Sequence, residues 1–402
     1  MTNGLQALTC ALTMADRQHV RPHGGTLVDC TAPEAQLPEL ERIAEEAPRL
    51  PVDLFTTMDA LNVAVGAFSP LRGFLGETDF RAVCERKQLA SGLTWTVPVL
   101  LHVPPGMAKR LKPDSQLALV NQEAVPFALL KVESVFTVAK TQYAESVFGT
   151  ADAAHPGVDR LAAQSDTCVG GTLTLLREPD IENRQYFFRP RETRKLFAER
   201  GWQTVAAFHT RNVPHRAHEY LQKLALSYVD GLFVHPIVGW KKSGDFSQRA
   251  QFETYEALLE HYYPPNRTLL GGFYCQVRYA GPREAVFHAI VRQNFGCTHI
   301  IIGRDHAGVG KYYGVYDGHR AFDTIKDLEI TALRFAGPYY CKRCEEIVTE
   351  RTCPHSGEDV CDISGTLVRR YVANRERVPN YLLREEVMQV LERLATEEAF
   401  VR

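Results

Sequence analysis

The chain has 402 residues, of which 45% are hydrophobic and 23% are charged, and its formal net charge is −2 at pH 7. Its length predicts two or three domains with ample core, and its composition is typical of a soluble globular protein. The acidic balance argues against a general nucleic-acid binder, and neither a membrane span of about 18 apolar residues nor a signal peptide is predicted.

Residues 1–171 are expected to be rich in β-structure with short helices. The strand-like runs 93–103 and 116–138 are broken by Pro and Gly residues. His155 lies in a Pro-Gly turn, and we interpret it as a loop histidine rather than a ligand. Residues 183–193 have the character of a linker into a second domain, and a helix is expected over 191–200.

Residues 204–208 form a short apolar, β-branched run, which predicts a buried strand. Pro214 follows at a plausible first helical position, where its missing N–H has no cost. Four apolar residues then follow at helical spacing and predict a buried stripe, namely Ala217, Leu221, Leu224 and Tyr228. The order is strand, short polar loop and helix. Such a geometry directs unpaired backbone N–H groups and the positive helix end towards the loop.

Four polar side chains on this loop and helix are expected to converge on one small volume. Arg211 and Asn212 belong to the loop, and His215 and His218 lie three residues apart, as neighbours on the first helical turn. An arginine and two imidazoles at a helix N-terminus suit phosphate or another oxyanion. Two alternatives are an ordinary surface histidine pair and a zinc site, although helical zinc pairs are usually four residues apart.

Strand-like and helical segments alternate from residue 204 to about 335. A helix over 248–262 and strands over 232–238, 269–277 and 299–303 are expected. The alternation predicts a Rossmann-like parallel sheet with helices on both faces, and ligands in such sheets bind at the carboxyl ends of strands. Lys241 and Lys242 follow one of these strands, either beside an anion or as a solvated pair.

Cysteine and histidine cluster near the end of the chain. Cys341 and Cys344 form a C-x-x-C pair, and Cys353 and His355 follow shortly after. This clustering predicts a structural zinc site, closed by four protein ligands, with Cys361 as the alternative fourth ligand. A redox pair or incidental thiols are the competing interpretations. The other six cysteines are scattered singly, which suggests reduced thiols and a cytoplasmic protein.

Residues 209–219 read His-Thr-Arg-Asn-Val-Pro-His-Arg-Ala-His-Glu. This resembles the Gln-Thr-Arg-Asn…His-x-x-His signature of the ATP sulfurylase (sulfate adenylyltransferase) family, except that His209 stands where the family usually has Gln. Similarity extends over nearly the whole chain through six further segments, residues 68–74, 155–158, 235–239, 278–284, 303–308 and 363–369. Some bacterial members resemble the Cys/His segment as well.

The resemblance implies a three-part architecture. Residues 1–171 would form a PUA-like β-barrel domain, residues 172–335 a Rossmann-like nucleotidyltransferase α/β catalytic domain, and residues 336–402 a small C-terminal subdomain with the zinc-binding segment. PUA-like domains elsewhere bind RNA, but the acidic balance gives no support for that role here. Relatives suggest a homodimer.

The resemblance also implies the reaction and its residues. ATP and sulfate would give adenosine 5′-phosphosulfate and pyrophosphate by direct attack of sulfate on the α-phosphorus, with Mg²⁺ arriving with ATP. Sulfate would contact His209, Arg211 and the backbone N–H of Ala307. The ATP-binding positions would be Thr210, Asn212, His215, His218, Gly303, Arg304 and His306, and the catalytic positions Arg211, Asn212, His215, His218 and Arg304.

His209 raises a further expectation about pH. An imidazole has a pKa near 6.5 when unperturbed, so a charged His209 is expected to be accessible. Sulfate affinity would then improve as the pH falls towards 6, and less so in His209→Gln. Two other functions remain open from the sequence, a nucleotidyltransferase with a different acceptor and a non-catalytic nucleotide or RNA binder.

Overall fold

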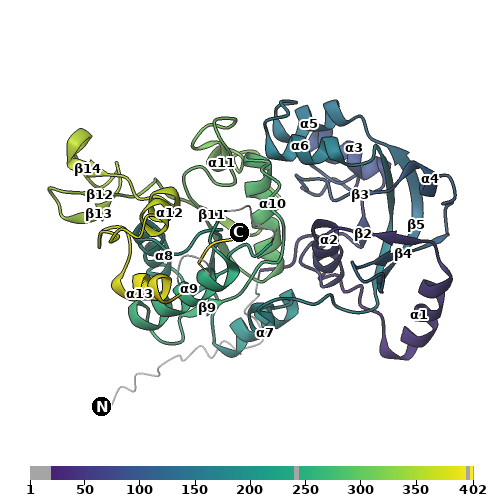
Figure 1. Ribbon diagram of the computed structural model, residues 1–402, viewed down its shortest axis with the longest axis horizontal. Helices are drawn as coiled ribbons and strands as arrows, with labels where there is room; N and C mark the ends of the chain where they lie inside the picture. Colours follow the sequence, from purple (N-terminus) through teal and green to yellow (C-terminus); the bar gives the residue numbers. More distant parts are fainter. Residues whose placement is uncertain (1–19, 240–243, 395–398, 402) are drawn as a thin grey trace, which may run out of the picture.

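The computed structural model describes residues 20–239, 244–394 and 399–401 (Figure 1). Its first half is built on a six-stranded sheet in the order β1-β4-β5-β6-β2, with β3 also paired to β6. Its strands are β1 (Arg49–Pro51), β2 (Gly73–Phe74), β3 (Leu101–His102), β4 (Gln116–Val120), β5 (Pro126–Thr137) and β6 (Thr167–Leu175). The helices of this half are η2 (Glu34–Gln36), α1 (Leu37–Glu46), α2 (Leu54–Ala64), α3 (Glu77–Arg86), α4 (Pro105–Ala108), α5 (Lys140–Phe148) and α6 (Pro156–Ala163).

The strand expectations for this half are only partly met. The run 116–138 forms β4 and β5, whereas the run 93–103 contributes only the two-residue β3. Trp95, Val97 and Val99 are buried, so this extended chain packs into the core without joining the ladder, and Pro98 has no N–H to donate. β6 was not predicted because Gly170 and Gly171 lower its strand propensity.

The second half contains a five-stranded sheet in the order β11-β10-β7-β8-β9, and all four neighbouring pairs are parallel. Its strands are β7 (Val205–Phe208), β8 (Gly231–Val234), β9 (Thr268–Leu270), β10 (His299–Ile302) and β11 (Thr331–Arg334). The helices are η3 (Arg184–Tyr186), α7 (Pro190–Glu199), α8 (Arg216–Leu226), α9 (Gln248–Tyr262), α10 (Pro282–Asn294) and α11 (Asp317–Arg320). The predicted parallel α/β fold is confirmed, and strand order reverses between β7 and β10, where such sheets bind ligands.

Helices cover both faces of this sheet. Along β7, Val205 and Ala207 belong to one hydrophobic core together with α10, while Ala206 and Phe208 belong to a second core with α8 and α9. The α10 core is continuous with the core of the first half, where Phe287 packs edge-on against Phe68 and Trp95. α10 therefore joins the two halves, between which it lies in Figure 1.

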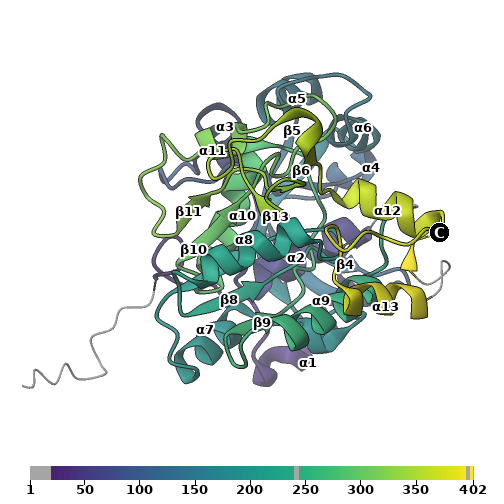
Figure 2. The ribbon, with the colours of Figure 1, turned by 90° about the vertical axis from the view of Figure 1, so that its left-hand side faces the viewer.

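The last part of the chain packs on the second core. A small sheet in the order β13-β12-β14 consists of β12 (Tyr339–Cys341), β13 (Glu346–Val348) and β14 (Val360–Cys361). The short helix η4 (Gly357–Asp359) lies directly before β14, and α12 (Gly365–Ala373) and α13 (Glu385–Arg393) follow the sheet. Val387, Met388 and Leu391 of α13 join the α8 and α9 core, and Figure 2 shows α13 beside α9.

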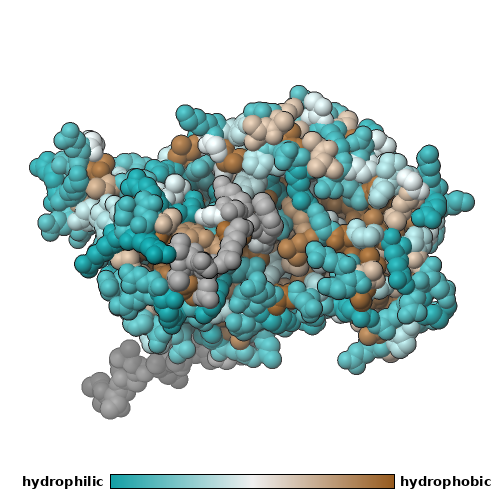
Figure 3. All heavy atoms as spheres, in the orientation of Figure 1, coloured by the Kyte–Doolittle hydropathy of each residue, from teal (hydrophilic) through white to brown (hydrophobic). Residues whose placement is uncertain are grey.

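Hydrophilic residues cover most of the face seen in Figure 3. Among the described residues, no helix combines the length and apolar character that a membrane crossing requires. The predicted pair Lys241 and Lys242 falls outside the described residues.

Candidate active site

The loop between β7 and α8 forms the centre of the candidate site, as predicted. His215 has extended backbone (φ −111°, ψ 168°) and caps α8, because its Nδ1 accepts a hydrogen bond from the N–H of His218 at 3.3 Å. The prediction that Pro214 is the first helical residue is therefore wrong, since the helix begins two residues later. Capping preferences emphasise side-chain oxygens, so an imidazole cap gives no sequence signal.

The buried face of α8 also differs from the predicted stripe. Ala217 and Leu221 are buried, but Leu224 and Tyr228 are 43% and 75% exposed. The buried face continues instead through Ala225, one further i,i+4 step from Leu221. After Leu221, the predicted stripe is therefore displaced by one residue from the face that is buried.

His215 and His218 stack on each other with ring centroids 3.5 Å apart. Burial lowers the pKa of His215 to about 4, and the nearby Asp362 only partly opposes this shift. Burial and His215 together hold the pKa of His218 well below its usual 6.5. Both imidazoles are neutral at pH 7, so the positive charge of the site comes from arginine.

We expect the neutral state of His215 to make folding stability depend on pH. Below pH 6.5 the unfolded chain protonates this histidine, whereas the folded protein does so only near its pKa of about 4. The unfolded state thus binds more protons, and stability falls with pH, by about 2 kcal/mol at pH 5 from this residue. Denaturant unfolding at pH 7.5 and pH 5 should show a smaller loss of stability in His215→Asn, which keeps a capping side chain, than in the wild type. His261→Asn, at an exposed position on α9, should keep the wild-type dependence, and an equal loss in all three proteins would contradict the assignment.

Arg211 and Arg304 extend from the ends of two neighbouring strands, β7 and β10, and both are exposed. Burial raises the pKa of Asp305, and the guanidinium groups of Arg211 and Arg304 both oppose that rise. The Cζ atom of Arg211 lies 5.7 Å from the ring centre of Tyr279, and Arg304 pairs with Asp362 at 3.3 Å. The two arginines therefore act on one shared carboxylate rather than on separate surfaces.

Asn212 is oriented by a residue of the C-terminal part. Its Oδ1 accepts a hydrogen bond of 2.8 Å from Nη1 of Arg369, which also lies 3.5 Å from Asp245. Because arginine only donates, this contact leaves the NH₂ group of Asn212 available to a ligand. A Cβ on Gly365 would lie 2.7 Å from the Asn212 side chain, so α12 approaches this closely only with glycine there. Ser364 caps α12.

The loop after β10 has unusual backbone geometry. Asp305 and Ala307 have φ values of +53° and +58°, a region that non-glycine residues occupy at a cost of roughly 1–3 kcal/mol and mainly at functional sites. A Cβ on Gly308 would lie 1.9 Å from Oδ1 of Asp305, so a larger residue there would require the Asp305 side chain to move. Gly303 directly follows the end of β10 and begins this loop. Thr210, which belongs to the loop between β7 and α8, is buried.

His209 and His306 meet a third histidine that the sequence did not indicate. One ring nitrogen from each of His209, His288 and His306 lies within 4.8 Å of the others. Burial holds the pKa of His209 well below 6.5, with His288 and Arg292 adding to the shift. The expected charged form of His209 at pH 6 is therefore wrong, because the residue is enclosed and faces cationic or titratable neighbours.

His288 and Arg292 lie on α10 with Glu284 at i, i+4 and i+8, all buried and on one face. This row of polar residues in an otherwise apolar helix is the signal that would have found them. Arg369 is the last residue of the segment 363–369, but nothing in the sequence indicates that it contacts Asn212.

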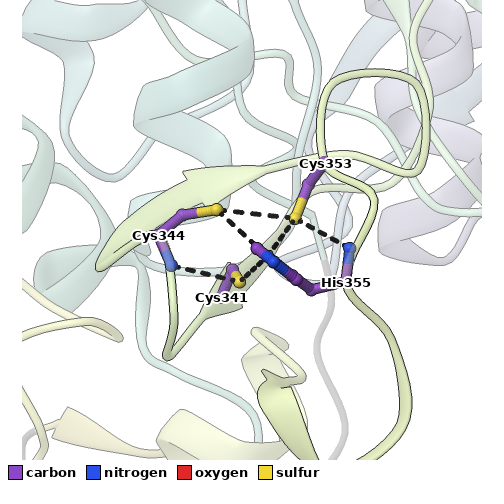
Figure 4. A group of neighbouring side chains, drawn as sticks. All are labelled: Cys341, Cys344, Cys353 and His355. Atoms are coloured by element: carbon purple, nitrogen blue, oxygen red, sulfur yellow. Dashed lines mark hydrogen bonds between the residues drawn. The ribbon is translucent and has the colours of Figure 1, made fainter.

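The Cys/His cluster has the geometry of a tetrahedral zinc site (Figure 4). Nδ1 of His355 lies 3.4–3.5 Å from the sulfurs of Cys341, Cys344 and Cys353, and the sulfurs of Cys344 and Cys353 are 3.7 Å apart. Zinc–sulfur and zinc–nitrogen bonds of ~2.3 and ~2.0 Å in a tetrahedron separate these atom pairs by about 3.5 and 3.8 Å. The donor set thus fits Zn²⁺, with His355 rather than Cys361 completing it.

A cavity of about 530 Å³ lies outside both the candidate active site and the Cys/His cluster. It is bounded by residues of α2 and α6 and by residues 276–279, and none of the predicted site residues lines it. Both of its arginines are already paired with carboxylates, Arg278 with Asp59 and Arg160 with Asp53, each at 2.7 Å.

Comparisons with known proteins agree with the geometry. The sequence model of the ATP-sulfurylase family matches residues 184–394, and that of the PUA-like domain matches residues 20–178. A sulfate adenylyltransferase of Hyperthermus butylicus is 44% identical over 371 residues, or 92% of this chain and 95% of the relative. One from Staphylothermus marinus is 43% identical over 95% of this chain and 99% of its own. A solved structure described as hexameric APS kinase from Thiobacillus denitrificans matches with a TM-score of 0.72 at 23% identity, covering 93% of this chain and 68% of its own, which bears on the fold alone.

Proposed function

Because the chain belongs to the ATP sulfurylase family and is a sulfate adenylyltransferase, we propose that Arg211 and Arg304 hold its two anionic substrates in one site. The reaction joins ATP and sulfate into adenosine 5′-phosphosulfate and releases pyrophosphate. The observation that carries the proposal is that both arginines follow the carboxyl ends of adjacent parallel strands, where strand order reverses. In agreement with this placement, both guanidinium groups lower the pKa of the Asp305 carboxyl.

Sulfate would lie nearest β7 and the strained loop after β10. Arg211 supplies the charge, and His209 and the backbone N–H of Ala307 supply hydrogen bonds. The ATP phosphates would be held by groups around the α8 N-terminus and the start of the second loop, namely Thr210, Asn212, His215, His218, Gly303, Arg304 and His306. Since His215 and His218 are neutral, they would bind phosphate oxygens as hydrogen-bond partners rather than as cations.

The chemistry proposed is an in-line attack of a sulfate oxygen on the α-phosphorus. Sulfate is fully ionised at neutral pH, so no general base is required, and mutual repulsion is the main obstacle. Two unit anions at 4 Å repel by about 1 kcal/mol in water and by about 4 kcal/mol at an effective dielectric constant near 20. Fixed guanidinium groups and N–H donors offset that repulsion and stabilise charge on the bridging oxygen.

Two metals belong to the proposal. Mg²⁺ would arrive with ATP and be held largely by its phosphates, since the metal-ligating clusters found among the described residues consist only of His and Cys. Zn²⁺ would occupy the site of Cys341, Cys344, Cys353 and His355, where four protein ligands leave no open position, so its role would be structural.

The three-part organisation of residues 1–171, 172–335 and 336–402 is also proposed, although β6 continues to Leu175 beyond the first boundary. Limited proteolysis would locate the boundaries. We further propose a homodimer, to be checked by sedimentation equilibrium. A cytoplasmic location is supported by the free state of all nine described cysteines, and cell fractionation would test it.

Sulfate-dependent release of pyrophosphate from MgATP tests the function directly. We expect pyrophosphate release to require sulfate. It should proceed with inversion of configuration at a chirally labelled α-phosphorus, because one in-line displacement inverts that centre. Release that is equal without sulfate, or greater with another acceptor, would contradict the substrate assignment. Retention of configuration would contradict direct attack.

A further inference from the structure

Arg292 is a fully buried arginine without a carboxylate partner among the described residues. Its Nη2 lies 2.7 Å from Nδ1 of His209 and 3.1 Å from the backbone carbonyl of His235, and its Cζ lies 4.4 Å from the ring centre of Phe273. Burying a guanidinium without a counter-ion is costly. The contact with His209 is therefore the feature of this residue that needs a functional explanation.

The direction of that hydrogen bond follows from chemistry. Arginine carries five N–H donors and no acceptor, so Nδ1 of His209 must be the acceptor. A neutral imidazole that accepts at Nδ1 carries its proton on Nε2. We propose that Arg292 fixes His209 in this Nε2–H tautomer and thereby makes it a constant hydrogen-bond donor to sulfate. The inference rests on the proposed sulfate-binding role of His209.

The Nε2–H tautomer gives His209 the same kind of N–H donor that a glutamine amide would supply at this position. A glutamine whose carbonyl oxygen accepted from Arg292 would direct its NH₂ group away from the arginine. The Nε2–H group of His209 offers the same donor from the opposite end of a ring. Arg292 would thus act as a positioning residue for either side chain.

The Nε2 atom of His209 is not consumed by its neighbours. No described residue hydrogen-bonds to this atom. It is also not among the buried atoms left without a partner, so it is open to solvent or to a ligand. The ring of His288 packs against His209 with centroids 3.9 Å apart and planes tilted by 33°, and no hydrogen bond joins the two rings. Nδ1 of His288 instead lies 3.1 Å from Nε2 of His306, and its Nε2 lies 3.5 Å from the carboxylate of Glu284.

The same three histidines are close enough to bind a metal ion, but the Arg292 contact disfavours it. A histidine that binds a metal through one nitrogen usually donates its other N–H to an acceptor. Here the second nitrogen of His209 instead accepts a hydrogen bond from the cationic side chain of Arg292. The arrangement therefore suits an anion, and purified protein should contain one zinc per chain rather than two.

The groups around His209 all oppose its protonation. Arg292 and His288 face it from α10, His306 from the loop after β10 and His235 from the end of β8, and each lowers its pKa. His209 consequently stays neutral, and the KM for sulfate should not change between pH 6 and pH 8 on its account.

The experiment combines a spectroscopic and a kinetic measurement. Nitrogen-15 spectra of histidine-labelled wild type, with His209→Gln to assign the signal, report which ring nitrogen carries the proton even without substrate. Arg292→Met should raise the KM for sulfate by roughly tenfold through loss of one oriented hydrogen bond, with the KM for ATP unchanged. Arg292→Lys, which also only donates, should retain most of the wild-type sulfate KM.

A matched control is Arg194→Met. Arg194 also lies against α10 but donates only to the backbone carbonyls of Gln293, Asn294 and Val20, so it should affect stability without affecting the sulfate KM. A proton on Nδ1 of His209, or an unchanged sulfate KM in Arg292→Met, would overturn the proposal. If Arg292→Met does not fold, the wild-type spectrum and Arg292→Lys still decide. A protonated Nε2 without sulfate-dependent turnover would contradict the proposed function but not the tautomer.

Discussion

Replacing Arg211 with alanine will lower kcat/KM for sulfate by about a thousandfold, or about 4 kcal/mol of transition-state stabilisation. Arg211 is the exposed cation at the end of β7, and the neighbouring imidazoles of His215 and His218 are neutral. No histidine at this end of the site can therefore replace the lost charge at pH 7. Steady-state pyrophosphate release at varied sulfate concentration provides the measurement.

Two comparisons separate charge from geometry in that result. Arg211→Lys keeps a positive charge but loses the planar fork that binds an oxyanion through two N–H groups, so activity should be restored only in part. Arg81→Ala removes an exposed arginine that pairs with Glu77 on α3 and should leave sulfate kinetics unchanged. Wild-type kcat/KM in Arg211→Ala would refute the proposed sulfate contact.

The central part of the site follows from local sequence signals. The apolar run at 204–208, the polar loop and the helix after it are local features. β7 forms where the run indicates, and α8 follows the loop but begins two residues later than Pro214 suggests. The alternation of strands and helices likewise specifies a parallel sheet, and the reversal of strand order between β7 and β10 brings Arg211 and Arg304 together. The resemblance to a known family supplied the roles of these residues, which periodicity alone does not give.

The unpredicted features depend on contacts between segments far apart in the chain. Arg369 reaches Asn212 across 157 positions, and Arg292 reaches His209 across 83. The glycines of β6 weaken its strand signal, yet a Cβ on Gly171 would lie 2.1 Å from the carbonyl of Lys131 on the paired strand. In each case tertiary packing, rather than local propensity, selects the residue.

The protonation states show the same dependence on tertiary structure. A histidine read from sequence carries its unperturbed pKa near 6.5, and His209 was expected to become charged on that basis. Enclosure beside Arg292 and His288 shifts its pKa well downwards instead. The site thus combines exposed arginines, which carry positive charge, with neutral imidazoles, which provide oriented hydrogen bonds.

Loss of zinc should have the largest effect on stability. Structural zinc sites contribute an apparent binding free energy of about 10–16 kcal/mol in isolated zinc-finger peptides. Cys344→Ser removes one of four ligands, so we expect zinc content to fall from one per chain towards zero and the Tm to fall markedly. Mass-spectrometric metal analysis and calorimetry measure the two changes.

The effect should extend to the nucleotide site. The small sheet beside the Cys/His cluster ends at Cys361 in β14, directly before Asp362, which pairs with Arg304, and α12 with Arg369 follows shortly after. Loosening this segment should therefore raise the KM for ATP more than that for sulfate. Cys361→Ser is the matched control, because this neighbouring thiol lies outside the ligand cluster and should retain both zinc and the wild-type Tm. Zinc loss in Cys361→Ser as well as in Cys344→Ser would assign the fourth ligand to Cys361 instead of His355. Zinc retention in Cys344→Ser would contradict the proposed ligand set. Wild-type stability after complete zinc removal would show that the metal does not support the fold.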